Sequence, residues 1–289
     1  MELLVEPPID VIRSRAIPID TSFGPFEGGR GAELNIAGQG SVRVDERTIT
    51  ASVVDDQFED QLVAFANGWG RTLWLALNGV FSFHGVTAQK DGVGIAILAE
   101  SRLGASMTAV SLAEIGWSVI SDGACALTLE KKSTIALPGP QPLEVDAAIA
   151  EMTTLKWPAM PAPTMRPRIA VTVPRFTNPC KLVHIVDLRV SRLYSTPEIL
   201  AADRSEGGAV NTLRERCAVG NAVIERNRQL REGLDSFCSG AITRTRFSFA
   251  LTPQGDRDSP FRPSDVARLI DLHFSESESS SESTEADGT

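Results

Sequence analysis

Alternating apolar and polar positions mark the early part of the chain as sheet-forming. Val42 and Val44 are each followed by a polar residue, and two threonines continue the alternation. A period of two places every second side chain on the same face of a strand. The pattern therefore predicts short strands within 32–38 and 41–54, joined by glycine turns.

The spacing becomes helical after residue 54. Three apolar side chains recur three or four positions apart: Phe58, Leu62 and Phe65. The carboxylate of Asp55 or Asp56 is suited to accept the free backbone N–H groups of a first turn. We expect a helix that begins there and ends near Gly68.

Strand and helix signals alternate over the rest of the chain. Strands are predicted at 92–100, 117–121, 124–130, 168–176, 182–190 and 243–253. Helices are predicted at 106–117, 144–152, 197–208, 209–240 (one or two helices) and 263–274. Asp122 and Gly123 suit a turn, and the Pro-rich residues 138–167 suit surface connections. Strand, loop, helix and strand in succession over 93–129 favour an α/β or α+β domain on a central sheet.

Composition limits the class of protein. The chain has 289 residues, of which 42% are hydrophobic, enough for the core of one large or two modest domains. No apolar run reaches the roughly 18 residues of a membrane span, and the acidic N-terminus does not resemble a secretory signal. The cysteines and histidines are too scattered for a zinc site or a disulfide framework: Cys125, Cys180, Cys217, Cys238, His84, His184 and His273. We expect a cytoplasmic protein with buried thiols, no bound metal and no membrane partner.

The net charge of −9 is unevenly distributed. Residues 1–155 carry 10 basic and 20 acidic side chains, residues 156–274 carry 18 and 12, and residues 275–289 carry none and five. The three segments therefore contribute −10, +6 and −5. The last segment is rich in serine and lacks apolar side chains except one alanine, so we expect it to be disordered. No basic-aromatic motif is present, and we expect no nucleic-acid partner.

Residues 83–130 contain an ordered series of short motifs. They are His84-Gly85, Gly92-Val93-Gly94, the apolar residues 95–98, a helix at 106–115, Gly116 and Ser121-Asp122. In order and spacing this stretch resembles the nucleotide-binding core of the HPr kinase/phosphorylase family, which shares its fold with phosphoenolpyruvate carboxykinase. The resemblance implies an α/β (α+β) fold: a central mixed sheet flanked by helices, a degenerate phosphate loop and additional C-terminal helices. It implies one such domain over 31–274, with a helical part from about 198, after an irregular segment 1–30.

The segment that corresponds to the phosphate loop departs from the working pattern. It reads Ala99, Glu100, Ser101, Arg102, Leu103, Gly104, Ala105 and Ser106. A Walker A loop needs glycines for close approach to phosphate and a lysine that reaches the β and γ oxygens. Ala99 and Ala105 replace the first glycine and the lysine, and Glu100 adds a repelling charge. We therefore expect no nucleotide or other cofactor, although Arg102 would be a substitute cation.

The resemblance also identifies vestiges of the catalytic groups. In the family a paired aspartate acts as base and organises the metal; here Asp122 remains and Gly123 replaces its partner. His84 matches a family histidine, and Ser106 keeps the hydroxyl that a metal ion would use. Each also has an ordinary structural role: a turn residue, a strand residue and a helix cap.

The sequence leaves three classes of function open. The interpretation we favour is a catalytically degenerate HPr-kinase-like adaptor that recognises a precursor peptide, leader peptide or partner enzyme in ribosomal peptide natural-product biosynthesis. HPr-kinase-like proteins resemble tailoring components of such pathways, including those for lasso-type peptides. A degenerate member would serve as the recognition component does in daptide-type clusters. The alternatives are an ATP- or GTP-dependent kinase with a rearranged site, using Asp122 as base and Ser106 with a metal, and a structural subunit.

Two surfaces are candidates for the partner. The first is a set of arginines that forms either a solvated face or a binding face: Arg214, Arg216, Arg226, Arg228 and Arg231. The second is the strand region 32–54, including Val42 and Val44, where an extended peptide would add as a further strand.

Overall fold

The computed structural model describes most of the chain, and its residues divide into two compact units. The described residues are 9–14, 18, 20–25, 31–99, 104–139, 143–146, 159–161, 168–191, 198–201, 206–253 and 263–282. The first unit comprises Met1–Ser82 and Leu213–Gly240, and the second comprises Phe83–Thr212 and Ala241–Thr289. The resemblance implies one domain over 31–274, although the length alone also allows for two modest domains.

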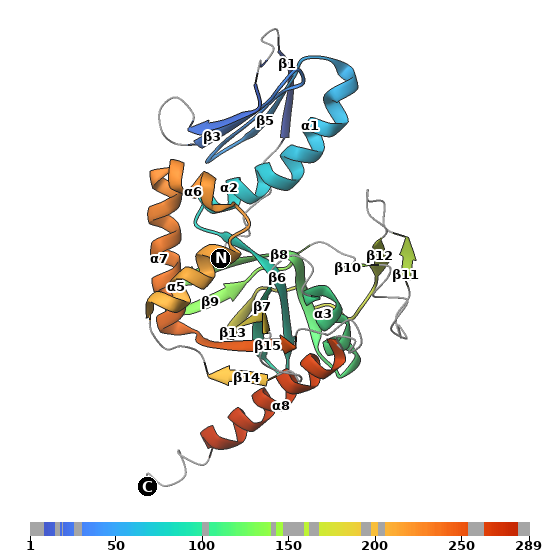
Figure 1. Cartoon of the computed structure of the whole chain (residues 1–289), viewed down its shortest axis with the longest axis vertical. Coiled ribbons are helices and arrows are strands. Elements are labelled where there is room, and N and C mark those ends of the chain that lie inside the picture. Colours follow the sequence, from blue (N-terminus) through green and yellow to red (C-terminus); the bar gives the residue numbers. More distant parts are fainter. Residues whose placement is uncertain are drawn as a thin grey trace. The chain divides into compact units, whose positions relative to one another are not determined.

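A five-stranded sheet is the centre of the first unit (Figure 1). Its strands are β1 (Ile9–Arg13), β2 (Ser22–Pro25), β3 (Gly31–Ile36), β4 (Gly40–Asp45) and β5 (Ile49–Val53). They lie in the order β1-β5-β4-β3-β2; β1 runs parallel to β5, and the other pairs are antiparallel. The middle three strands are predicted by the alternation. The outer two fall in the segment for which the sequence predicts irregular structure.

Helical residues follow β5 from Asp56 to Leu77. They comprise a 3-10 turn (Asp56–Phe58), α1 (Glu59–Phe65), a π-helical segment (Ala66–Gly70) and α2 (Arg71–Leu77). Asp55 caps the start, as predicted, and accepts a hydrogen bond from the Gln57 backbone N–H. The predicted end near Gly68 is wrong. The chain stays helical there, and a side chain on Gly70 would lie 3.1 Å from Ile49 Cγ2, so this glycine lets the helix approach the sheet closely.

Three helices occupy residues 206–244, where the sequence predicts one or two. They are α5 (Glu206–Arg216), α6 (Asn221–Arg226) and α7 (Arg228–Arg244). In the first unit, Leu230, Leu234 and Phe237 of α7 are buried. The ring of Phe237 lies 5.5 Å from that of Phe81, so α7 packs against the last residues of the 1–82 segment of this unit.

A seven-stranded mixed sheet is the centre of the second unit. Its order is β14-β15-β13-β7-β6-β8-β9. The strands are β6 (Phe81–Lys90), β7 (Val93–Ala99), β8 (Ser118–Glu130), β9 (Ser133–Ala136), β13 (Cys180–Ser191), β14 (Glu198–Ala201) and β15 (Arg246–Pro253). The strands β7, β13 and β15 are parallel, so their C-terminal ends point to the same side. This arrangement confirms the predicted α/β class with a central mixed sheet.

The second sheet also curls back on itself. The first residues of β13 pair with β9 as well as with β7. This closure brings backbones close: a side chain on Gly94 would lie 2.4 Å from the carbonyl oxygen of Lys181. Gly94 in β7 is therefore required by the approach of β13.

Two helices cover one face of this sheet. They are α3 (Ala105–Glu114) and α8 (Pro263–Glu282), which pack against each other (Figure 1). Both contribute to a buried apolar cluster with Ile95, Ile97 and Ala99 of β7 and with Val186 and Leu188 of β13. The strand and helix predicted at 92–100 and 106–117 are thus confirmed, as is the helix predicted at 263–274.

A small three-stranded sheet in the second unit corrects one prediction. It has the order β10-β12-β11 and comprises β10 (Leu143–Asp146), β11 (Ala159–Pro161) and β12 (Arg168–Val171). The sequence predicts a helix at 144–152, but Glu144 to Asp146 pair with β12. Leu143 and Val145 are buried in the apolar cluster, which favours the alternating strand over the helix.

Three further predictions in the second unit are wrong. The expected turn at Asp122-Gly123 is absent, because β8 runs without a break and Gly123 adopts φ +79° within it. The helix predicted to begin at 197 is instead β14, which pairs with β15. The backbone of α8 continues to Glu282, into the segment predicted to be disordered.

Candidate functional site at the start of helix α3

The candidate site lies where β7 is followed by α3, at the position of the loop singled out in the sequence. β7 ends at Ala99, and α3 begins at Ala105 after Gly104, which has φ +82°. The backbone N–H and the hydroxyl of Thr108 both donate to the Gly104 carbonyl, at 2.8 and 3.0 Å. Glu100, Ser101 and Arg102 lie outside the described residues. The first turn of α3 therefore begins directly after a glycine with positive φ, and Ala105 is its first residue.

The structure brings Ser106 and Asp122 together. The Ser106 hydroxyl donates a hydrogen bond of 2.8 Å to Asp122 Oδ1, across 16 positions of sequence. In P-loop NTPases the Ser or Thr of the loop and an Asp from another strand hold the magnesium ion. Ser106 and Asp122, both singled out in the sequence, thus form a direct hydrogen bond with each other.

Arg175 is a third member of this site that sequence reasoning missed. Its guanidinium donates to the carbonyl oxygens of Ile120 and Gly139, at 3.0 and 2.6 Å. Partial burial lowers the pKa of Arg175, and the negative charge of Asp122 opposes this shift. The segment is held by a parallel bridge between Arg175 and Val119. An arginine at the end of the apolar run 168–173 is the signal that would have found it.

A pair of buried hydroxyls lies one residue before Asp122. Ser121 and Thr87 are 2.6 Å apart, and both are buried. The thiol of Cys125 contacts the Phe83 carbonyl at 3.1 Å. Together these contacts show that β6 and β8 run antiparallel. They attach to β6 the part of β8 that carries Asp122.

His84 does not belong to this group. It is exposed on β6, and no hydrogen bond or ion pair with it occurs among the described residues. Gly85, which follows it, is needed for packing: a side chain there would lie 2.1 Å from the Ile97 carbonyl oxygen. The His-Gly motif therefore owes its glycine to strand packing.

A second polar group, also missed from the sequence, lies on the opposite face of the sheet. Asp187 in β13 has no exposed surface and pairs with Arg189, whose guanidinium also donates to the Thr212 hydroxyl at 2.7 Å. Val186 and Leu188 pack under α3, so Asp187 between them points to the other side. This pair is therefore separate from the Ser106–Asp122 site.

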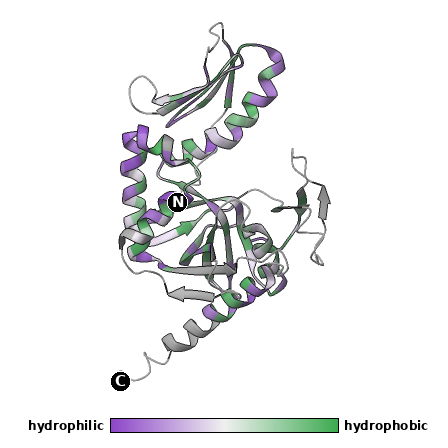
Figure 2. Cartoon of the chain, viewed as in Figure 1, coloured by the Kyte–Doolittle hydropathy of each residue, from purple (hydrophilic) through white to green (hydrophobic). Residues whose placement is uncertain are grey.

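The five candidate arginines do not form one solvated face. Arg216 is only 4% exposed, which contradicts a solvent-facing or partner-facing role for it. Arg214 pairs with Asp235 at 2.5 Å, Arg228 pairs with Glu232 at 2.7 Å, and Arg226 donates to the Phe23 carbonyl at 3.2 Å. Figure 2 shows hydrophilic and hydrophobic residues alternating along α7. Helix α5 ends by burying one arginine because its spacing turns Arg216 inward.

Val42 and Val44 are also misplaced as partner-binding residues. Both are completely buried in β4, which lies between β5 and β3. The strands predicted at 32–54 are interior strands of the sheet, so a peptide cannot add to them. The outer strands are β1 and β2, which the sequence does not predict.

Comparison with known proteins gives similarity to solved structures and none to a family model or a curated protein. No protein-family model and no curated protein matches the chain. Among solved structures, it is similar to the Hpr(Ser) kinase/phosphatase from Coxiella burnetii, with 12% sequence identity and a TM-score of 0.36. The match covers 72% of this chain and 99% of that one.

Two features are absent from the part of the chain that the structure describes. No described helix has the length and apolarity needed to cross a membrane. Within the same residues, no cluster of three or more His, Cys, Asp or Glu side chains could hold a metal ion.

Proposed function

We propose that this chain is a binding protein of HPr-kinase-like design that does not transfer phosphoryl groups. The observation that carries the proposal is the 2.8 Å hydrogen bond between Ser106 and Asp122, next to an alanine at the lysine position. Phosphoryl transfer depends on positive charge positioned at the β and γ phosphates. Here the hydroxyl and the carboxylate satisfy each other, and Ala105 provides no charge.

The partner we propose is a peptide or a peptide-modifying enzyme in the biosynthesis of a ribosomally made natural product. Support for this step is the resemblance of residues 83–130 to HPr-kinase-like proteins, some of which resemble components of such pathways. A scaffold that retains its core but lacks the charged groups of catalysis retains surfaces for recognition. An adaptor that presents a precursor to other enzymes fits these properties.

Restoring the phosphate loop tests the proposal. Ala99→Gly with Ala105→Lys should create affinity for ATP, seen as a rise in melting temperature with Mg-ATP of a few °C. The unmodified chain should show a shift below about 1 °C under the same conditions. Ala64→Lys, at an exposed position of α1, is the matched control and should create no affinity. Absence of any gain in the double variant would mean that 99–106 is not a phosphate loop.

A second candidate, a kinase with a rearranged site, is favoured by Arg175. Its positive charge lies close to Asp122 and would replace that of the missing lysine. In this case Asp122 acts as base, and Ser106 holds a metal ion. Mg-ATP would then stabilise the unmodified chain, and Asp122→Asn and Arg175→Gln would each abolish the stabilisation.

A further inference from the structure

The outer strand β1 is the least enclosed strand of the first sheet. It pairs only with β5 among the described residues, in register from Ile9 opposite Ile49 to Arg13 opposite Val53. Ile9 is partly buried, and the next four side chains are exposed, including Val11 at 40% and Ile12 at 50%. It is also the one parallel strand among the described pairs of this sheet.

The strand β5 beneath β1 also packs against α1 and the π-helical segment. Ile49, Ala51 and Val53 of β5 have no exposed surface. Four of the five side chains of β1 are exposed, so β1 adds little apolar burial of its own. Parallel pairing is slightly weaker per residue than antiparallel pairing. Segments with few buried contacts open locally long before the whole protein unfolds.

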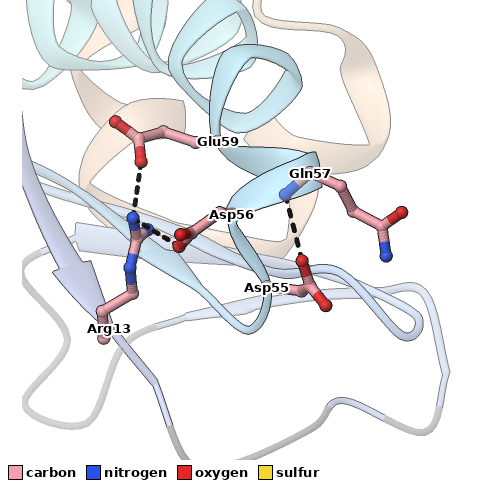
Figure 3. A network of polar contacts seen from close by, with 5 residues as sticks. All are labelled: Arg13, Asp55, Asp56, Gln57 and Glu59. Atoms are coloured by element: carbon pink, nitrogen blue, oxygen red, sulfur yellow. Dashed lines mark hydrogen bonds and ion pairs between the residues drawn. The ribbon is translucent and has the colours of Figure 1, made fainter.

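One charged contact ties β1 to the rest of the unit (Figure 3). The Arg13 guanidinium lies 2.6 Å from Asp56 Oδ1 and 2.7 Å from Glu59 Oε2, at the start of α1. All three side chains are substantially exposed, and exposed ion pairs contribute little to stability. Asp55 adds to the negative potential at Arg13. One arginine therefore faces three carboxylates, so this acidic group keeps an excess negative charge when β1 is paired with β5.

We propose that the edge of β5 is a docking site for an extended basic peptide, and that β1 occupies this site until such a peptide displaces it. The peptide runs parallel to β5 and follows the pattern of β1: apolar, any, apolar, any, basic. Its basic residue takes the place of Arg13 between Asp56 and Glu59. Main-chain hydrogen bonds supply affinity, and the alternate side chains supply selectivity.

Charge favours a separate peptide over the β1 strand of a second copy. The β1 strand of a second copy would bring the same single arginine, together with the carboxylate of Asp10, which adds a negative charge. A peptide with further basic residues neutralises the excess negative charge better. The inference rests on the proposed binding function, because it names the site and the class of peptide.

A reversible lock on β1 tests the inference in the full chain. Val11 and Ala51 are register partners, and paired strands lie about 4.8 Å apart, within the Cα distances that a disulfide spans. The variant Val11→Cys/Ala51→Cys should therefore close β1 onto β5 when oxidised. The matched control, Ser22→Cys/Asn35→Cys, locks β2 to β3 at the opposite edge.

The probe is a fluorescent synthetic peptide with the sequence of residues 7–15, PPIDVIRSR, in which Asp10 is replaced by Lys. Binding should weaken at least about tenfold on oxidation of the β1 lock and recover on reduction. It should not change on oxidation of the control. A probe that also carries Arg13→Glu should bind several times more weakly to the reduced chain. It should regain affinity for a chain with Asp56→Lys and Glu59→Lys.

Three results would overturn the inference. They are equal binding to the locked and unlocked chains, no binding to the reduced chain, and dimer formation by the reduced chain without peptide binding. If the cysteine variants do not fold, hydrogen exchange of the unmodified chain decides. Exchange at 9–13 as slow as at 40–45 would then contradict a displaceable β1. Phosphoryl transfer by the chain would defeat the proposed function and leave these peptide results standing.

Discussion

The two sheets differ in how they treat their polar residues. In the second unit polar groups lie in pairs in or near the core: Ser106 with Asp122, Thr87 with Ser121, Asp187 with Arg189, and Thr245 with Thr134. In the first unit most side chains of the edge strand β1 are exposed, and its Arg13 forms exposed ion pairs with the start of the helical segment. Polar groups of the second sheet are therefore bound to each other, whereas those of the β1 edge in the first sheet remain accessible to solvent.

The largest expected effect separates core from edge. Ile97→Ala should destabilise the protein by about 3 kcal/mol, because Ile97 is fully buried under α3 and its loss leaves a cavity. Val11→Ala should cost less than about 1 kcal/mol, since Val11 is exposed on β1. Urea unfolding followed by circular dichroism measures both. Equal losses would mean that β1 is part of the core.

Acid should destabilise the second unit through His184. Burial lowers the pKa of His184 to about 4, and the positive charges of Arg246 and His273 add to the shift. The unfolded chain, with a pKa near 6.5, binds this proton first. The contribution of neutral His184 to the free energy of unfolding is therefore complete above about pH 6.5. It falls by about 3 kcal/mol as the pH is lowered towards 4. His184→Leu should flatten the pH dependence of the melting temperature in this window, and an unchanged slope would assign it to other groups.

The Ser106–Asp122 contact should have a moderate effect. Ser106→Ala leaves Asp122 without this donor and should cost about 1 kcal/mol of unfolding free energy. Ser239→Ala, at an exposed position on α7, is the control and should change stability by less than about 0.5 kcal/mol. Equal changes for the two serines would mean that the Ser106–Asp122 hydrogen bond does not stabilise the fold.

Arg13→Glu should have the smallest effect on global stability. The ion pairs at Arg13 are exposed, so the melting temperature should move by less than about 2 °C. Hydrogen exchange at 9–13 should nevertheless accelerate. Arg43→Glu, which breaks the exposed pair with Glu33 in the same sheet, is the control and should leave exchange at β1 unchanged.

The sequence predicted elements with regular patterns and failed where burial decides. The alternation at 41–54 and the apolar run at 92–100 gave the correct strands. The segment from 144 was misread as a helix because its strand pairing with β12 is a long-range contact. Gly123 resembled a turn residue, but in β8 it supplies a positive φ within a continuous strand.

Motif order singled out Ser106 and Asp122 as separate residues, and the structure adds that they form a hydrogen bond with each other. Arg175 was missed because it is 53 positions from Asp122 in the sequence and carries no motif. The outer strand β1 was missed because the adjacent apolar residues Val11 and Ile12 do not show the alternation of a half-buried strand. Two prolines also precede it in the sequence.

The most direct test of the central claim is equilibrium binding of Mg-ATP to the unmodified chain, measured by titration calorimetry. The account predicts no heat of binding at millimolar nucleotide, because Ser106 and Asp122 satisfy each other and the lysine is absent. It also predicts measurable binding by the Ala99→Gly/Ala105→Lys variant. Saturable binding by the unmodified chain that disappears in Asp122→Asn would contradict the account and establish the site as a working nucleotide pocket.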